Sequence, residues 1–265
     1  MVFEIISGDQ VAAAVAAEAA NIMIYGAPGV GKTTEAVKAF CVNGRCTAFY
    51  AQCEDGALKS ILTQGLPLPD TVRNSQTGLP LTIIGWEPLW DILCYVATHR
   101  QLYNALIIDT LTTWTASTYA ALQAAGFGKG NGWAIPMYIR DRLIDLRNYA
   151  RQLGVHVIYT AHFRDPYNED GIFYKGGPSL SPKKASELFY GTVDTMLRAD
   201  YMSIGGNVQR VYYTGGLDWD KATLGMQPPS VMQWFQKNRE NVSQAVIPAD
   251  LRNYLLARRP PYQGL

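Results

Sequence analysis

The sequence predicts an α/β fold in which helices flank a mainly parallel sheet. Apolar segments of strand length alternate with segments of helix length through most of the chain. Three of the apolar segments, residues 47–52, 105–109 and 155–160, end in or lead directly into acidic or polar residues. Because the carboxyl ends of parallel strands meet at one edge of a sheet, we expect the functional residues to line that edge.

A glycine-rich motif follows the first strand segment. Residues 26–33 read GAPGVGKT and satisfy the phosphate-loop pattern G-x-x-x-x-G-K-[ST]. The apolar residues 22–25 precede the motif as a strand should, and residues 35–40 follow it with their apolar side chains at helical spacing. In such a loop, backbone amides and the positive end of the following helix bind the phosphates of a nucleoside triphosphate. The alternative is a strand–turn–helix corner that is glycine-rich by chance.

The side chains of the motif suggest specific roles. Lys32 supplies a mobile positive charge for the β- and γ-phosphates, and the hydroxyl of Thr33 is placed to ligate Mg²⁺. Asp109 ends the apolar run 105–108 in the form of a Walker B strand, so we expect its carboxylate to hold the same Mg²⁺ through water. We therefore expect ATP and Mg²⁺ as cofactors. The nucleotide contacts are expected from Gly26, Ala27, Pro28, Gly29, Val30, Gly31, Lys32, Thr33 and Thr34.

Composition limits the partners and the compartment. The chain has 265 residues and 48% hydrophobic content, enough for one substantial core. Lys+Arg of 23 against Asp+Glu of 22 means that any nucleic-acid contact must come from local clusters. The four cysteines form no C-x-x-C pair and there are only three histidines, so we expect reduced thiols and no zinc site. No apolar run approaches the length of a membrane span and no signal peptide is recognisable, which favours the cytoplasm.

The other elements follow from the same patterns. Residues 201–214 read as a β-hairpin that turns at residues 205–207. We expect residues 1–227 to form the core with a short N-terminal helix, and residues 228–265 to form a helix-bearing C-terminal tail. Further helices are expected at residues 9–19, 88–98 and 136–153, and further strands at 81–84 and near 193–198.

The order of these segments resembles a known family of ATPases. TAFYAQCEDGALKS, residues 47–60, resembles the RecA-fold segment in which the second strand ends in a glutamate that activates the attacking water. VIYTAH, residues 157–162, resembles the last core strand of that fold, which ends in a polar sensor. Residues 176–200 resemble the strand entry after the second DNA loop of recombinases. Over roughly residues 21–215 the chain is thus similar to the RecA-like P-loop NTPase core shared by bacterial recombinases, hexameric replicative helicases and short phage-encoded RecA-like ATPases.

The resemblance implies catalytic roles for individual residues. Glu54 would be the base that activates water, and His162 would sense the γ-phosphate. Their alternatives are a solvated carboxylate at a strand end and a polar residue that caps a strand. The family's ATP lies at a subunit interface of a homo-oligomer, ring or filament, and a neighbour contributes a basic residue. The first candidate for that residue is Lys221, followed by Arg210 and Arg239.

Two loops carry the expectation of a single-stranded DNA partner. The first, residues 126–133, interleaves Lys129 with Phe127 and Trp133 on a glycine-rich backbone, which suits base stacking. The second lies within residues 163–185, where basic and acidic residues partly cancel. The alternative for both is a surface loop or an oligomer contact.

Together these expectations describe an ATP-binding and hydrolysing RecA-like protein that acts on single-stranded DNA in phage-type recombination, annealing or repair. If the protein is phage-encoded, its compartment is the host cytoplasm. A helicase or DNA-packaging motor is an alternative, although a packaging motor usually has a glutamate where this chain has Thr110. A nucleotide-gated assembly factor with little turnover is another alternative, and a small-molecule kinase is a further one.

Overall fold

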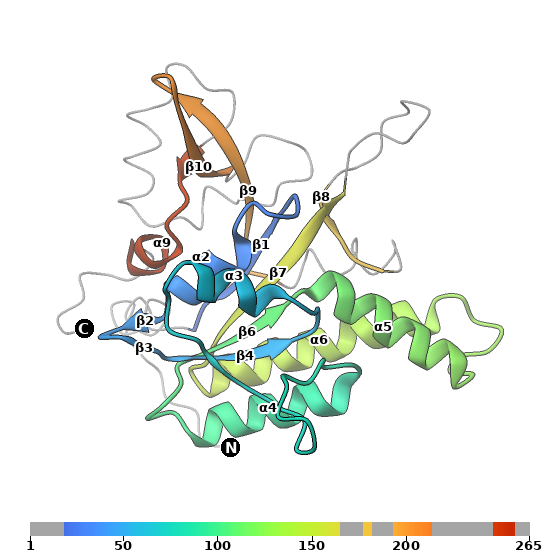
Figure 1. Cartoon of the computed structure of the whole chain (residues 1–265). Coiled ribbons are helices and arrows are strands. Elements are labelled where there is room, and N and C mark those ends of the chain that lie inside the picture. Colours follow the sequence, from blue (N-terminus) through green and yellow to red (C-terminus); the bar gives the residue numbers. More distant parts are fainter. Residues whose placement is uncertain (1–18, 165–176, 182–192, 214–245, 258–265) are drawn as a thin grey trace, which may run out of the picture.

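The computed structural model describes residues 19–164, 177–181, 193–213 and 246–257. These residues form a nine-stranded sheet and a separate two-stranded hairpin (Figure 1). The strands are β1 (Asn21–Gly26), β2 (Cys41–Val42), β3 (Arg45–Cys46), β4 (Ala48–Gln52), β5 (Asp70–Thr71), β6 (Ala105–Asp109), β7 (His156–Arg164), β8 (Gly177–Ser179), β9 (Thr195–Ile204), β10 (Asn207–Tyr213) and β11 (Val246–Pro248). The helices are α2 (Lys32–Lys38), α3 (Ala57–Thr63), α4 (Trp86–Thr98), α5 (Leu111–Ala124), α6 (Ala134–Gln152) and α9 (Leu251–Ala257).

The main sheet is mostly parallel, as the sequence predicted. Its order is β11-β10-β9-β1-β7-β6-β4-β5, and β8 pairs with β7 outside this path. The strands from β9 through β1, β7, β6 and β4 to β5 are parallel, while β8, β10 and β11 pair in the antiparallel sense. β7 therefore lies between the strand of the phosphate loop and the strand that ends in Asp109. This is the core of an α/β P-loop NTPase.

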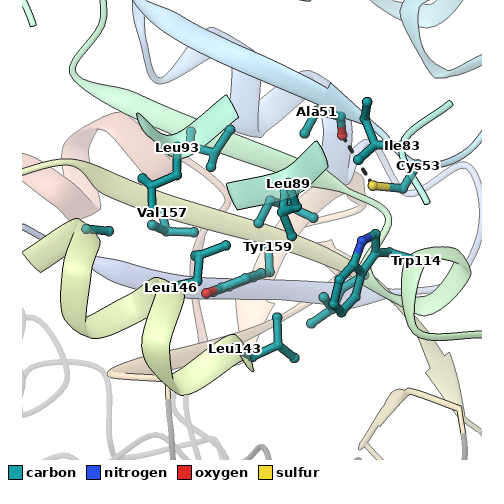
Figure 2. Packing of buried hydrophobic residues seen from close by; sticks show 14 of the residues in the cluster. Ala51, Cys53, Ile83, Leu89, Leu93, Trp114, Leu143, Leu146, Val157 and Tyr159 are labelled. Atoms are coloured by element: carbon teal, nitrogen blue, oxygen red, sulfur yellow. Dashed lines mark hydrogen bonds between the residues drawn. The ribbon is translucent and has the colours of Figure 1, made fainter. Parts of the chain in front are cut away.

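Two hydrophobic cores lie on opposite faces of the sheet. One core packs the strands against α4, α5 and α6, and Figure 2 shows Leu89, Trp114 and Leu146 of these helices meeting Tyr159 of β7. The other core packs the strands against α2, α3 and α9. Because both faces are covered, the central strands are buried along their whole length, which explains their nearly continuous apolar sequence.

Several elements differ from the predictions. Residues 81–84 form no strand: only Ile83 is buried, and its amide donates to the carbonyl of Gln52 at 2.7 Å. The predicted strand near residues 193–198 and the first arm of the hairpin are one continuous strand, β9, and the turn falls at residues 205–206. The hairpin β2–β3 and the helix α5 were not predicted.

The two ends of the chain lie partly outside the described residues. The predicted N-terminal helix falls almost wholly there, and so does the division between residues 227 and 228, which stays a prediction. Within the described part, β11 pairs with β10 in the main sheet and Leu251 of α9 is buried in the core beside α2.

None of the helices within the described ranges combines the length and the apolar character that a membrane crossing requires.

Candidate functional site

The phosphate loop connects β1 to α2 at the carboxyl edge of the sheet. Gly26 ends β1 so close to β9 that a Cβ there would lie 2.4 Å from the carbonyl oxygen of Ala199. Gly29 and Gly31 have φ of 79° and 84°, a left-handed conformation that glycine adopts without steric cost. A Cβ on Gly29 would meet no atom within 4 Å, so this turn of the loop faces open space. The glycines thus keep the loop tight against the sheet and its amides accessible.

Lys32 lies inside this loop. Its Nζ donates to the carbonyl oxygens of Gly26 at 3.0 Å and Ala27 at 2.9 Å, and the residue is only 6% exposed. Burial lowers the pKa of Lys32, while the nearby carboxylates of Asp109 and Glu54 act in the opposite direction. A buried ammonium facing two carboxylates is well suited to receive the negative charge of phosphates.

Asp109 is fully buried at the end of β6 and is held by three hydroxyl donors. Thr33 Oγ1 donates to its Oδ2 at 2.7 Å, and the Tyr50 hydroxyl donates to the same oxygen at 2.5 Å. Thr160 Oγ1 donates to the other carboxylate oxygen. Burial, and then the charge of Asp109, raise the pKa of Tyr50 well above its ordinary value, so this phenol stays a donor. The strands on both sides of β6 therefore fix the orientation of the carboxylate.

The residues at this point fit a magnesium ion that is carried by a phosphate chain. The Thr33 hydroxyl and the Asp109 carboxylate lie within hydrogen-bond distance of each other, and Mg²⁺ prefers such oxygen ligands. Among the described residues, no group of three or more His, Cys, Asp or Glu side chains could hold a metal. A site with one carboxylate and one hydroxyl needs phosphate oxygens and water to complete an octahedral shell, as Mg²⁺ sites in NTPases do.

Glu54 follows β4 and is oriented by the start of α5. Its Oε2 accepts hydrogen bonds from Thr110 Oγ1 at 3.1 Å and from Thr113 Oγ1 at 3.2 Å. His162 Nε2 lies 3.3 Å from the same oxygen. Thr110 also caps α5, because its side chain accepts from the Thr113 amide. The unpredicted helix α5 thus supplies the groups that position the predicted base.

The carboxylate of the next residue, Asp55, accepts hydrogen bonds from different donors. Asp55 Oδ1 accepts from Gln52 Nε2 at 3.3 Å and from Thr82 Oγ1 at 2.8 Å. Glu54, in contrast, is hydrogen-bonded toward α5 and His162. The structure therefore separates the two adjacent acids by their partners, although both line the same cavity.

His162 lies in β7, whose end is anchored to α5 and β8. The His162 amide donates to Thr112 Oγ1 at 2.9 Å, and Thr112 Oγ1 donates to the carbonyl of Ser179 at 2.6 Å. His156, in the same strand, is buried and accepts a hydrogen bond from the Ala20 amide. Of the two histidines in β7, only His162 reaches the carboxylate of Glu54.

One cavity of about 330 Å³ joins these groups. Its lining includes most of the residues that the sequence nominated: Pro28, Gly29, Gly31, Lys32, Thr33, Thr34, Glu54, Asp109 and His162. Ala27 contributes a carbonyl to Lys32, and Val30 is buried in the core beside α2. Lys221 and Arg239 lie outside the described residues. Sequence reasoning missed Tyr50 and Thr160, for which the one local signal is a polar group within an apolar strand.

Arg210 has a place that the sequence did not indicate. It comes from β10, and its Nη1 lies 2.7 Å from Glu35 Oε1 in the first turn of α2. A Cβ on Gly31 would lie 2.6 Å from the Cζ of Arg210, so the Arg210 guanidinium lies against the phosphate loop of its own chain. This position argues against Arg210 as the basic residue that reaches a neighbouring subunit.

The fold and this site define a P-loop ATPase-type domain: a phosphate loop on one strand, a magnesium-type aspartate two strands away and an acid positioned across the same cavity. The sequence model of a family described as an AAA domain matches residues 18–218. The chain therefore belongs to this AAA domain family. A search among curated proteins found no match.

Proposed function

We propose that the protein binds and hydrolyses ATP with Mg²⁺ and acts on single-stranded DNA in phage-type recombination, annealing or repair. The observation that carries the hydrolytic part is the position of Glu54. Its carboxylate lines the cavity of the phosphate loop and is held by Thr110, Thr113 and His162. An acid held at the phosphate end of such a cavity can accept a proton from the water that attacks the γ-phosphate.

The other residues divide the remaining work. Lys32 offers its charge to the β- and γ-phosphates, while Thr33 and Asp109 would hold the metal. Magnesium, when bound with the nucleotide, neutralises the charge that develops on the phosphate oxygens. His162 contacts an oxygen of Glu54 and lies in β7, directly before the predicted second DNA loop, much of which lies outside the described residues. This position supports a role in which His162 responds to the γ-phosphate and passes that state to the loop after β7.

The loop between α5 and α6 supports the DNA part of the proposal. Phe127 and Trp133 are 41% and 48% exposed, and Lys129 is exposed between them. The Phe127 ring packs edge-on against Tyr138 with centroids 5.1 Å apart, so it is held at the surface. Exposed aromatic rings beside a lysine are the usual means of holding single strands without sequence preference.

The helix α5 joins this loop to the catalytic acid. Thr110 and Thr113 at its start hold Glu54, and its last residue, Ala124, leads into the loop. A helix of 14 residues spans about 21 Å, so α5 connects the loop directly to the residues that hold Glu54. Single-stranded DNA bound at the loop could thus change the position of Glu54, the proposed base, through α5, which supports DNA-stimulated hydrolysis.

The test is ATP turnover with and without single-stranded DNA over a range of salt. We expect DNA to raise turnover, Trp133→Ala to remove most of this stimulation, and Lys32→Ala to abolish ATP binding. Leu79 is also an exposed apolar residue but lies outside this loop and outside the cavity lining, so Leu79→Ala is a control variant that should keep the stimulation. Turnover that ignores DNA at every salt concentration would contradict the DNA part and leave the ATPase part standing.

The proposal includes a homo-oligomer with ATP at the interface between subunits and Lys221 as the residue contributed by the neighbour. Arg210 rests on its own phosphate loop, which leaves that role to another residue. Mixing Lys221→Ala with Glu54→Gln subunits tests this: sites that combine an intact Glu54 with a neighbour's intact Lys221 should regain turnover. Mixtures no more active than the separate variants would exclude a shared site.

A further inference from the structure

The cavity at the phosphate loop has two ends, built by different parts of the sheet. Asp109 and His162 come from β6 and β7, and Glu54 follows β4, all on one side of β1. Tyr201 and Arg210 come from β9 and β10 on the other side. Neighbouring strands lie about 4.8 Å apart, so β6 and β10 are each roughly 10 Å from β1, in opposite directions. A ligand that extends along the cavity across the phosphate loop would therefore have one of these groups at each end.

Tyr201 and Arg210 act as one surface. They are directly paired across the antiparallel β9–β10 ribbon, so their side chains lie on the same face. Arg210 is fixed by Glu35 and rests against Gly31, and its Nε is buried without a hydrogen-bond partner among the described residues. Tyr201 remains 50% exposed although it lines the cavity. The pair is thus a cation docked on the phosphate loop and, beside it, an accessible aromatic ring.

Resting on the proposed function, we infer that Tyr201 and Arg210 form the nucleoside end of the site, where the Tyr201 ring stacks on the base of a nucleoside triphosphate. The γ-phosphate lies at Glu54, where water must be activated, and the chain of phosphates crosses the loop at Lys32. The base then emerges on the side of β9 and β10. Apart from His162 at the phosphate end, Tyr201 is the one aromatic residue among the described residues that line the cavity, and an aromatic face is what a base stacks on. The third wall, at α3, offers Ser60 and Gln64, whose side chains have no ring and donate hydrogen bonds to the Ala57 carbonyl and to Thr34 Oγ1.

Arg210 determines where this stacking surface lies. Its ion pair with the buried Glu35 ties β10 to α2, and its guanidinium places positive charge at the phosphate loop near the nucleoside side. Because Tyr201 is its cross-strand partner, the backbone of Tyr201 has a set position relative to the loop. Stacking does not depend on hydrogen bonds to base edges, so this end of the site should accept different bases.

The experiment compares two probes that share a phosphate chain: Mg·ATP, and Mg·tripolyphosphate, which has no nucleoside. Affinities are measured by calorimetry for the wild type, Tyr201→Ala and Tyr201→Phe. We expect Tyr201→Ala to weaken ATP binding by about 5- to 150-fold, the range of base–aromatic stacking, and to leave tripolyphosphate binding unchanged. Tyr201→Phe keeps the ring and should bind both probes as the wild type does.

A matched control is Tyr213→Ala. Tyr213 is in the same ribbon, but its ring contacts Arg198 and it does not line the cavity. The Tyr213→Ala variant should therefore bind both probes as the wild type does. The inference is overturned if Tyr201→Ala leaves ATP binding unchanged or weakens both probes equally. Failure of the proposed function looks different: Lys32→Ala would then bind both probes as tightly as the wild type.

Discussion

Replacing Glu54 with glutamine tests the assignment of the catalytic base. The glutamine carbonyl oxygen can still accept the hydrogen bonds that Thr110 and Thr113 donate at 3.1 and 3.2 Å, so the side chain should keep its place. What is lost is the ability to take a proton. General-base catalysis contributes about 10²- to 10⁴-fold, or roughly 3–5 kcal/mol of transition-state stabilisation. We expect the rate of phosphate release in a single turnover to fall by that factor, while ATP binding stays close to that of the wild type.

Asp55→Asn is the control for this experiment. Asp55 is the next residue, also carries a carboxylate and lines the same cavity, but it is engaged by Gln52 and Thr82. Its substitution should change the rate by less than about ten-fold, because no base is removed. Equal losses for the two variants, or a Glu54→Gln enzyme that turns over at the rate of the wild type, would refute the assignment.

Three further predictions concern stability. Tyr50→Phe removes a buried donor from the Asp109 carboxylate, so the free energy of unfolding measured in urea should fall by about 1.5–3 kcal/mol. A variant as stable as the wild type would show that this hydrogen bond contributes nothing to stability. Gly26→Ala places a methyl group 2.4 Å from the backbone oxygen of Ala199, so we expect it to lower the free energy of unfolding by about 1–3 kcal/mol. An unchanged melting temperature would contradict the close packing of β9 against the loop. Burial raises the pKa of Cys46 to about 12. The buried thiol therefore contributes fully to stability below pH 9, and this contribution is lost as the pH rises from 9 to 12, because the thiol then ionises in the unfolded chain alone. The difference in unfolding free energy between the wild type and Cys46→Ala should therefore shrink by up to about 1.4 kcal/mol per pH unit in that window, and a constant difference would show that the thiol is not shielded.

The parts of the site that the sequence revealed are those that depend on neighbours in the chain. Glycines at fixed spacing before Lys32 and Thr33 identify the phosphate loop, and Asp109 is recognised as the acid that ends an apolar run. The alternation of elements was also enough for the parallel sheet. These signals are local, since each depends on a single stretch of backbone.

The residues that were missed depend on which strands become neighbours. Tyr50 and Thr160 reach Asp109 because β4 and β7 lie on either side of β6. Nothing in their own segments indicates that pairing. Arg210 likewise meets Glu35 across a sequence separation of 175 residues.

The wrong and missing elements have similar causes. The helix α5 is rich in threonine, which has low helix propensity, and its stability comes from the buried Leu111 and Trp114 and the Thr110 cap. Residues 81–84 have strand-forming composition, but β5 already occupies the outer edge of β4. Only Ile83 finds a strand partner there, through the carbonyl of Gln52. In both cases tertiary packing overrides local propensity.

Residues 246–257 pack against the part of the sheet and core that lies beside the phosphate loop. β11 covers the edge of β10, the Ala249 amide donates to the Arg210 carbonyl, and Leu251 of α9 is buried in the core beside α2. Until β11 pairs with it, β10 presents an unpaired edge, the kind of surface on which chains associate wrongly during folding. A fragment that stops at residue 218, where the family match ends, would keep Lys32, Glu54 and Asp109 but lack Lys221 and β11, so the exposed edge of β10 makes aggregation its expected failure.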